Sequence, residues 1–377
     1  MKKRICHIST VHTAKDDRIF YKECLSLTKH GYEVFLVIPN PTDISIDDVQ
    51  IKAIDMPKGR FSRLFKSQWQ ALQKALETKS ELYHFHDPEL MFFGMILKIL
   101  GKHVVYDVHE DLPKQILYKP WIRSSFIRII LSKLIYVFEQ FSCLFFDGIV
   151  SVTDDIAKKY KSSKTIILRN LPINSLVENL KIKPTISKQT NKLVFIYAGG
   201  LSRIREIKEV CQAIAHHKNK AELWLLGAWE SDEYRNECIT NQNDSFIKYM
   251  GFRTMPEVYQ YIGIADVGVA MLYPIKNYLT SLPIKAFEYM ALQKPLLMSN
   301  FEYWKDVFEG VAVFADAHNV DDISNKIKIL IEDDQLRQQL ARHGYERVQN
   351  DLNWEKESEK LFSLYNRILG NGDKESR

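Results

Sequence analysis

The sequence lacks the short motifs that identify several common protein classes. Its five cysteines are scattered without a CxxC pair, which disfavours a zinc finger or a disulfide framework and indicates a reducing compartment. Neither GxGxxG nor GxxxxGK[ST] occurs, which disfavours a classical dinucleotide dehydrogenase and a Walker-type nucleoside triphosphatase. The most apolar stretch, residues 122–146, carries four charged side chains, so it does not read as a membrane span.

Strong charge and a leader pattern are also missing. The start MKKRICHIST has a basic tip but no apolar core, so we read it as a first strand and expect a cytoplasmic protein. The net charge is +5, and its excess lies in residues 1–180, where 26 Lys and Arg face 20 Asp and Glu. No known nucleic-acid module accompanies that excess, so we expect no nucleic-acid partner.

Both halves of the chain alternate apolar runs with helical patterns. The strands expected in the first half are residues 4–9, 33–38, 82–86, 103–107 and 148–153. Those expected in the second half are residues 193–198, 222–226, 247–249, 267–271, 295–298 and 311–314. This alternation predicts an α/β protein with two doubly wound domains, each a parallel sheet with helices on both faces. Ligands of such folds bind at the carboxyl ends of the strands, which predicts a site in a cleft between the two domains.

The domain boundaries are expected where the periodic pattern breaks. Residues 1–172 form the predicted N-terminal domain, and 173–190 form a linker with prolines and many Ser, Thr and Asn residues. Residues 191–355 form the predicted C-terminal domain. Residues 356–377 continue a final helix that we expect to pack back toward the N-terminal domain.

The clearest motif in the second half is SLPIKAFE, a turn that leads into a helix at residues 281–288. The N-terminus of a helix offers free backbone N–H groups, which suit a diphosphate. Glu288 lies one to two turns inside and can accept hydrogen bonds from two ribose hydroxyls. The alternative is an acidic residue that stabilises its own helix.

A second motif, YAGGLSRIRE, follows the first strand of the second half. Gly199 and Gly200 let the backbone approach a ligand closely. Arg205, or Arg203, carries a guanidinium whose forked donors suit phosphate oxygens. The alternative for these arginines is a solvated charge at the start of a helix.

Three strand ends in the first half carry ionisable groups. The segment DVHED places His109 and Glu110 directly after a buried strand, and HFHDPE places His86 and Asp87 after another. Two histidines and an aspartate could suggest a metal, but no third ligand at metal spacing follows along the chain, so we expect polar contacts without a metal. In the loop HTAKDDR, Asp17 and Arg18 either pair with each other or bind a ligand.

Taken together, these segments resemble the family 4 glycosyltransferases, retaining enzymes of the GT-B fold, of the bacterial polysaccharide-biosynthesis type. The resemblance covers essentially residues 4–369 and lies in the order and spacing of the motifs. It implies two Rossmann-like domains that face each other across a cleft. The N-terminal domain would bind the acceptor, and the C-terminal domain the nucleotide-sugar donor.

The resemblance also implies roles for single residues. The donor-binding residues would be Gly199, Gly200, Arg205, Ser281, Leu282, Lys285 and Glu288. The residues beside the reacting sugar would be His109 and Glu110, and the acceptor side would comprise His12, Asp17, Arg18, His86 and Asp87. Thr280 and Gly200 depart from the family, where many members carry a glutamate and an arginine. Contacts to the transferred sugar would then come from the backbone or from Ser281.

The implied function is transfer of a hexose-type sugar, with retention, from a UDP- or GDP-sugar to a saccharide or lipid-linked saccharide in cell-surface polysaccharide biosynthesis. No metal and no cofactor is expected. One alternative is a sugar-nucleotide 2-epimerase of the same architecture, and another is a non-catalytic subunit that binds nucleotide sugars.

Two stretches combine cations with large apolar groups. Residues 58–74 and 112–138 each carry five basic residues, with Trp69 and Phe126 among the apolar residues interleaved. Neither stretch contains an acidic residue. This combination predicts peripheral contact with the anionic inner face of the cell membrane. The alternative is that the apolar residues belong to the core.

Overall fold

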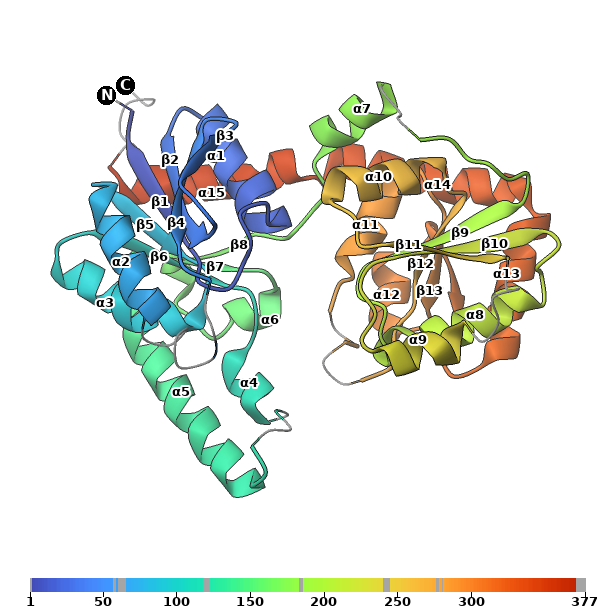
Figure 1. Ribbon diagram of the computed structural model, residues 1–377, viewed down its shortest axis with the longest axis horizontal. Coiled ribbons are helices and arrows are strands. Elements are labelled where there is room, and N and C mark those ends of the chain that lie inside the picture. Colours follow the sequence, from blue (N-terminus) through green and yellow to red (C-terminus); the bar gives the residue numbers. More distant parts are fainter. Residues whose placement is uncertain are drawn as a thin grey trace. The chain divides into compact units, whose positions relative to one another are not determined.

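The computed structural model describes residues 2–370 except 57–58, 60–65, 118, 120–121, 183–185, 240–244, 276–277 and 280 (Figure 1). The chain forms two compact units, and each is described by itself. Unit 1 comprises Met1–Asn170 and Lys356–Arg377, and unit 2 comprises Leu171–Glu355. The last helix, α15 (Trp354–Ile368), begins in unit 2 and belongs to unit 1 from Lys356 onward.

Unit 1 is built on one sheet with the strand order β3-β4-β2-β1-β5-β6-β7-β8. Its strands are β1 Arg4–Ile8, β2 Glu33–Pro39, β3 Ile44–Ile46, β4 Val49–Ile54, β5 Leu82–Phe85, β6 His103–Val108, β7 Gly148–Ser151 and β8 Thr165–Ile167. All neighbours pair in parallel except β3 and β4. The turn between these two strands has positive φ at Asp47 and Asp48, as a tight hairpin requires.

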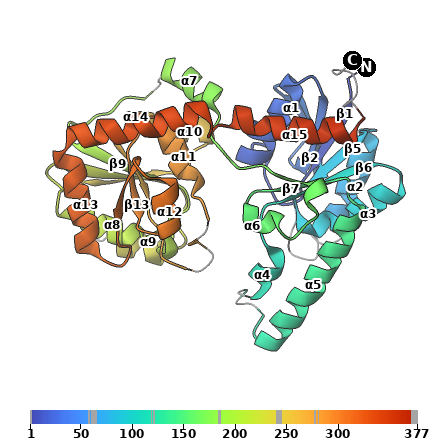
Figure 2. The ribbon, with the colours of Figure 1, turned by 180° about the vertical axis from the view of Figure 1, so that it is seen from behind.

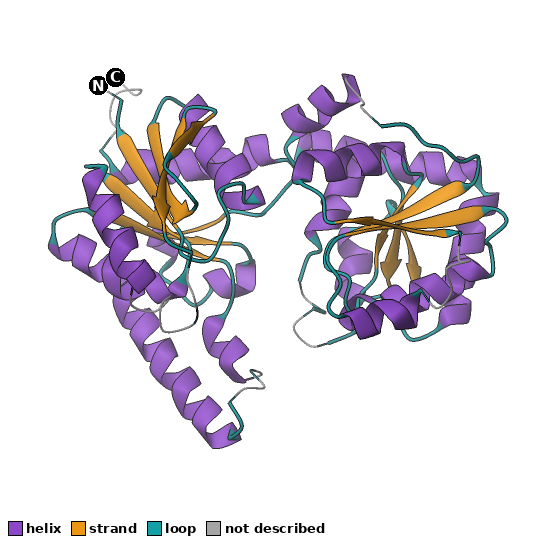
Figure 3. Cartoon of the chain, viewed as in Figure 1, coloured by secondary structure: helices purple, strands orange, loops and turns teal. Residues whose placement is uncertain are grey.

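The helices of unit 1 cover both faces of the sheet (Figure 3). They are η1 Asp17–Cys24, α1 Leu25–Lys29, α2 Gln68–Glu77, η3 Pro88–Leu90, α3 Met91–Ile99, α4 Leu112–Leu117, α5 Ser125–Phe145, α6 Asp154–Ala157, η4 Ser162–Lys164 and α15. On one face, the alternate apolar side chains of β1, β2, β5 and β6 pack with α2, α3 and α5 in a core cluster. On the other face lie α1 and α15 (Figure 2). The alternation of side chains along β1 and β5 places polar groups such as His7 and His84 there.

Unit 2 has a parallel sheet with the order β11-β10-β9-β12-β13-β14. Its strands are β9 Leu193–Ala198, β10 Ala221–Leu226, β11 Ile247–Gly251, β12 Val267–Ala270, β13 Leu296–Ser299 and β14 Ala312–Ala315. Numbered within the unit, this is the order 3-2-1-4-5-6 of the Rossmann fold, which reverses between β9 and β12. Ligands of such sheets bind beyond the carboxyl ends at that reversal.

The helices of unit 2 enclose its sheet from both sides (Figure 1). They are α7 Asn174–Ile182, η5 Arg203–Arg205, α8 Ile207–Ala215, α9 Asp232–Cys238, α10 Met255–Ile264, α11 Ile284–Ala291, α12 Glu302–Val307, α13 Val320–Glu332 and α14 Asp334–Asn350. The core cluster joins the apolar side chains of β9, β10 and β12 to α8, α9 and α13. A capping box between Thr254 and Glu257 fixes the start of α10.

The predicted α/β fold class is confirmed, and each expected strand has a counterpart within a few residues. Three strands were not predicted: β3, β4 and β8. The segment 173–190, expected as a linker, contains the helix α7 in its first half. Among the described helices, none has the length and apolar character needed to cross a membrane.

Candidate functional site

In unit 1, the loops after three neighbouring strands bring polar groups together. His12 follows β1, Asp87 follows β5 and His109 follows β6, and these strands pair in the order β1-β5-β6. The rings of His12 and His109 lie 5.6 Å apart, edge to face. The structure therefore gathers the residues predicted at three separate strand ends at one edge of the sheet.

Asp87 ties two of these loops together. It is 3% exposed, and its Oδ2 accepts hydrogen bonds from the backbone N–H and the hydroxyl of Thr10 and from the hydroxyl of Ser9. A buried carboxylate with several donors is a fixed structural anchor. Asp87 therefore holds the loop after β1 in place, and His12 lies 3.9 Å from its other oxygen.

His109 is oriented by Asp107, a fully buried carboxylate at the end of β6. The Nε2 of His109 lies 3.0 Å from Asp107 Oδ2. Arg18 binds the same carboxylate with two hydrogen bonds, Nε at 2.9 Å and Nη2 at 3.1 Å. Burial alone would raise the pKa of Asp107, but Arg18 and His109 outweigh it and hold that pKa well below its usual range. Asp107 therefore stays ionised and fixes the ring of His109, whose side chain is 21% exposed.

His12 is held by a second carboxylate. Its Nδ1 lies 2.9 Å from Asp16 Oδ2, and Asp16 also caps the helix η1 by accepting from the backbone N–H groups of Arg18 and Ile19. Burial lowers the pKa of His12, but the hydrogen bond to Asp16 and the nearby Asp87 outweigh it, so the pKa is raised overall. Burial raises the pKa of Asp16, but the hydrogen bonds from His12 and from the backbone N–H groups of Ile19 and Arg18 outweigh it and lower that pKa to about 2.

Two residues predicted for this edge lie apart from the group. The side chain of Glu110 is exposed and accepts a hydrogen bond from Gln115. Asp17 is exposed in the first turn of η1. The expected choice for Arg18 was a pair with Asp17 or a ligand contact. In the structure, Arg18 is buried and pairs with Asp107 and Glu23.

Behind this edge lies a buried group that the sequence reading did not assign. His7, His84, His86 and Glu23 converge on the face of the sheet that carries η1 and α15, and all four side chains are inaccessible to solvent. Burial lowers the pKa of each of these histidines, of His86 to about 4, so their rings are neutral. The signal that could have revealed the group is a histidine at the centre of an otherwise apolar strand, at position 7.

In unit 2, the loop after β9 meets the first turn of α11. Gly199 has a φ of 137°, and a Cβ added there would lie 3.0 Å from Lys285 Nζ. Gly227, also at 137°, packs so closely that a Cβ would lie 2.0 Å from the carbonyl oxygen of Gly199. Both positions therefore require glycine. Gly200 has open space at its Cβ position.

Two cations gather at this loop. Lys285 Nζ stands over the Tyr197 ring, 3.4 Å from its centre, while Arg205 lies close enough to both to shift their pKa values. Burial, and then repulsion by Arg205, lower the pKa of Lys285 well below its usual range. Two cations forced together in this way favour an anion between them. Arg203 is committed elsewhere, because it forms a two-bond pair with Glu237.

The remaining predicted donor residues that the structure describes lie on α11 or directly before it. Glu288 lies on α11, one turn after Lys285, and accepts a hydrogen bond from the Tyr259 hydroxyl at 3.4 Å. Ser281 is fixed through its carbonyl, which accepts from Trp304 Nε1 at 2.7 Å. Leu282 is partly exposed beside it. Thr280 lies outside the described residues.

Glu206, which follows Arg205, was also not singled out from the sequence. It has a left-handed backbone with φ 55°, it is 0% exposed, and both carboxylate oxygens lack a hydrogen-bond partner. Burial, followed by repulsion from Glu209 and Asp316, raises its pKa to about 9. Glu206 is thus a strained, protonated carboxyl group at the carboxyl end of the sheet.

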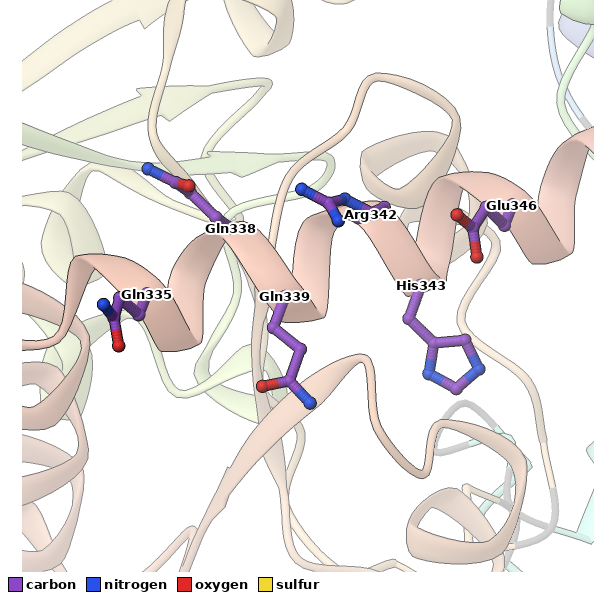
Figure 4. A pocket seen from close by; sticks show the side chains of 6 residues that line it. All are labelled: Gln335, Gln338, Gln339, Arg342, His343 and Glu346. Carbon is purple, nitrogen blue, oxygen red and sulfur yellow. The ribbon is translucent and has the colours of Figure 1, made fainter.

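A separate surface hollow lies along α14 (Figure 4). It is lined by Gln335, Gln338, Gln339, Arg342, His343 and Glu346. All six come from successive turns of one helix, and their side chains point in different directions (Figure 4). None of the predicted site residues lines it, so we assign it no role in the site.

Two family models match the chain. The model described as Glycosyltransferase Family 4 matches residues 17–166, and the model described as Glycosyl transferases group 1 matches residues 178–347. A curated relative from Campylobacter jejuni, N,N'-diacetylbacillosaminyl-diphospho-undecaprenol alpha-1,3-N-acetylgalactosaminyltransferase, is 23% identical over 171 residues. That match spans 44% of this chain and 42% of the relative.

Solved structures share the whole fold at low sequence identity. Sucrose-phosphate synthase from Thermosynechococcus elongatus superposes with a TM-score of 0.73 at 16% identity, covering 98% of this chain and 100% of that one. Anabaena HepE, solved in complex with UDP and glucose, gives 0.67 at 13% identity, covering 97% and 100%. A trehalose-phosphate synthase from Burkholderia xenovorans gives 0.69 at 12% identity, covering 98% and 100%. The architecture shared with these proteins is GT-B.

Proposed function

Because the chain belongs to the glycosyltransferases of family 4, whose two domain models match residues 17–166 and 178–347, we propose that it transfers a hexose-type sugar from a nucleotide-sugar donor to a saccharide or lipid-linked saccharide. Transfer proceeds with retention, in the synthesis of cell-surface polysaccharide. Unit 2 binds the donor, and unit 1 binds the acceptor.

The observation that carries this proposal is the meeting of the Gly199 loop with the start of α11. The backbone at Gly199 and Gly200 lies open to a ligand, with the cations of Lys285 and Arg205 beside it. These groups fit the two phosphates of a nucleoside diphosphate. Glu288, one turn further along α11, has a carboxylate that suits the two hydroxyls of a ribose.

The chemistry follows from charge development at the donor. The bond from the sugar C1 to the diphosphate oxygen breaks, and a bond from C1 to the acceptor oxygen forms on the same face. The acceptor proton passes to the departing phosphate. Lys285 and Arg205 stabilise the charge that grows on the diphosphate, so this step uses side-chain cations in place of a metal ion. His109, fixed by Asp107, contacts the reacting sugar.

The relatives support this substrate class. HepE was solved with UDP and glucose, which supports a UDP-sugar donor over a GDP-sugar. The Campylobacter relative is named for a sugar linked through diphosphate to undecaprenol, which supports a lipid-linked acceptor. Both properties are those of the named proteins, and we extend them to this chain as part of the proposal.

Isotope-labelled donor, incubated with and without acceptor, separates the proposal from its alternatives. A transferase moves label into the acceptor and is slow without it. A 2-epimerase changes the sugar nucleotide without acceptor. A binding subunit leaves the donor unchanged both with and without acceptor. Labelled product that appears equally without acceptor would replace the proposal with the epimerase.

We further propose that α5 rests on an anionic lipid surface. The polarity of this helix is the reverse of the usual one in a water-soluble protein, where the buried side is apolar. Its buried residues are Ser132, Glu139, Ser142 and Cys143. Its exposed large apolar residues are Phe126, Ile127, Ile129, Ile130, Leu134, Tyr136, Val137, Phe138, Phe141, Leu144 and Phe145. A patch of this extent marks an interaction surface.

The charge on α5 favours lipid as its occupant. Arg123 and Lys133 are exposed, and the one acid of the segment, Glu139, is 1% exposed. The exposed surface of residues 122–145 thus combines cations with aromatic and aliphatic groups, as helices at anionic membrane surfaces do. The alternative, that these apolar residues belong to the core, does not hold for Phe126 and Trp69, which are 70% and 54% exposed. In the other stretch, 58–74, residues 58 and 60–65 lie outside the described residues.

A further inference from the structure

The buried group of His7, His84, His86 and Glu23 has the composition of a metal site. The four side chains each offer one ligand atom, and these atoms all lie within 4.8 Å of one another. In a tetrahedral site with ligand bonds of about 2.0–2.2 Å, neighbouring ligand atoms lie roughly 3.3–3.6 Å apart. The group therefore needs only a small contraction to close around one ion.

The fold explains how ligands far apart in sequence meet. The β1–β5 register places His7 directly opposite His84, and His86 is two residues further along the same face. These strands are neighbours at the point where the strand order of unit 1 reverses. Glu23 comes from η1, a π-helix, a rare form often found at functional sites. Sequence reasoning rejected a metal because no third ligand followed His86, but the tertiary structure supplies His7 and Glu23.

Glu23 is the observation that demands an explanation. Its side chain is inaccessible to solvent. Among the described residues neither oxygen accepts a hydrogen bond, although Arg18 Nε lies 3.0 Å from Oε1 as an ion pair. Its Oε2 lies 3.7 Å from His7 Nδ1, 3.8 Å from His84 Nδ1 and 3.9 Å from His86 Nε2. These separations are too long for hydrogen bonds and nearly equal. The carboxylate is thus aimed at a point shared by three ring nitrogens.

A hydrogen-bonded chain of neutral rings explains only part of this arrangement. His84 Nδ1 lies 2.7 Å from the Tyr365 hydroxyl, Tyr365 lies 3.2 Å from His7 Nε2, and His7 Nδ1 lies 3.0 Å from His86 Nε2. Such a chain satisfies most of the ring nitrogens, but among the described residues it gives no hydrogen bond to Glu23 Oε2, the oxygen that faces the three rings. A buried carboxylate oxygen that accepts no hydrogen bond is costly. A cation among the three nitrogens removes that cost.

The balance of buried charges nearby also favours an additional cation. Glu23 and Asp107 are two carboxylates that share one buried cation, Arg18, which lies 3.0 Å from Glu23 Oε1 and 2.9 Å from Asp107 Oδ2. Glu23 Oε2, on the other side of its carboxylate, faces the histidines. A second possible group, His86, Asp107 and His109, overlaps the first. There Arg18 already binds the carboxylate twice, so a metal ion in that group would meet its positive charge directly.

We propose that His7, His84, His86 and Glu23 bind one divalent transition-metal ion of the zinc class in unit 1. Four protein ligands and no exposed position make a closed site, which is the structural kind. His86 binds through Nε2, and its Nδ1 lies 3.2 Å from Asp107. A carboxylate on the far nitrogen orients a metal-bound imidazole. Because Asp107 also holds His109, the ion helps to fix the ring of His109 through His86 and Asp107. His7 keeps its contact to Tyr365 through Nε2.

The test is the metal content of the full chain, purified without a histidine tag and measured by mass spectrometry. We expect about one equivalent of zinc in the wild type and less than about 0.1 in Glu23→Gln, since metal-bound states depend on the full ligand set. His103→Ala is the matched control, because His103 lies at the opposite end of β6 and should leave the content unchanged. A folded wild type without transition metal overturns the proposal.

Cobalt substitution makes the test independent of whether the variants fold. Protein produced with Co²⁺ in place of zinc should show the visible absorption bands of a tetrahedral site with nitrogen and oxygen ligands. Octahedral cobalt spectra, or equal metal content in the wild type and a folded Glu23→Gln variant, would contradict the assignment. Neither readout requires transferase activity, so failure of this proposal and failure of the proposed function are distinguishable.

Discussion

In the proposed function, His109 is the residue of unit 1 that contacts the reacting sugar. It is held by Asp107 at the edge of the sheet and is partly exposed, so it can reach a ligand without supporting the core. We predict that His109→Ala lowers kcat about 100-fold, the cost of one lost transition-state contact, with little change in KM for the donor. Steady-state kinetics check this. His103→Ala is the control, and wild-type kcat in a folded His109→Ala variant would remove His109 from the site.

Glu206 gives a prediction about stability that depends on pH. Its pKa is raised to about 9 in the folded state, against an ordinary value of 4.5. Between these values the folded protein keeps a proton that the unfolded chain has lost, so the free energy of unfolding falls as pH rises. Glu206→Gly removes this effect and also the strain of a left-handed residue, about 1 kcal/mol. Urea unfolding should show a gain that is larger at pH 8 than at pH 5.

Glu206→Gln separates the two causes. Glutamine cannot ionise but keeps the left-handed backbone, so it should remove the pH dependence and leave the strain. A gain in Glu206→Gly that is equal at both pH values would show that the buried carboxyl is not the source.

At the scale of the element, α5 carries the membrane proposal. Phe126, Leu134 and Val137 are 70%, 62% and 63% exposed, so replacing all three with Ser removes little from the core. Because each buries apolar area on a lipid surface, we predict at least about a tenfold loss in binding to anionic liposomes, with the unfolding midpoint nearly unchanged. Co-sedimentation at low and high salt measures it.

Phe252→Ser is the control for this variant, since Phe252 is 73% exposed in unit 2. Equal co-sedimentation of the triple variant and the wild type would contradict the membrane role. A wild type that is dimeric in solution, with a monomeric triple variant, would instead place a second copy of the chain on α5.

Across the whole chain, the helices and strands that the sequence predicts are those with a clear apolar pattern. The buried parallel strands are continuous apolar runs, such as LVFIYA in β9, and can be located without a structure. The short edge strands β3 and β8, three residues each, give too weak a pattern. The helix α7 was missed because a segment with prolines and polar residues reads as a linker.

The site is predictable only where its residues are neighbours along the chain. Lys285 and Glu288 share one helix, and the motif names both. The meeting of His7 with His84 and Glu23 depends on β1 pairing with β5, and on η1 packing over them, which no local pattern specifies. The pair of Arg18 with Asp107 also depends on the tertiary structure, because the two residues lie 89 positions apart in the sequence.

The central claim is that unit 2 holds a nucleoside diphosphate with Glu288 on its ribose, and calorimetric titration with UDP and GDP tests it most directly. Glu288→Gln should weaken binding by about 1.5–3 kcal/mol, the range for hydrogen bonds to a charged group, which is roughly 10- to 150-fold in Kd. Glu302→Gln, an exposed position on α12, should bind as the wild type does. A wild type that binds neither nucleotide, or a folded Glu288→Gln variant with unchanged affinity, would contradict the account.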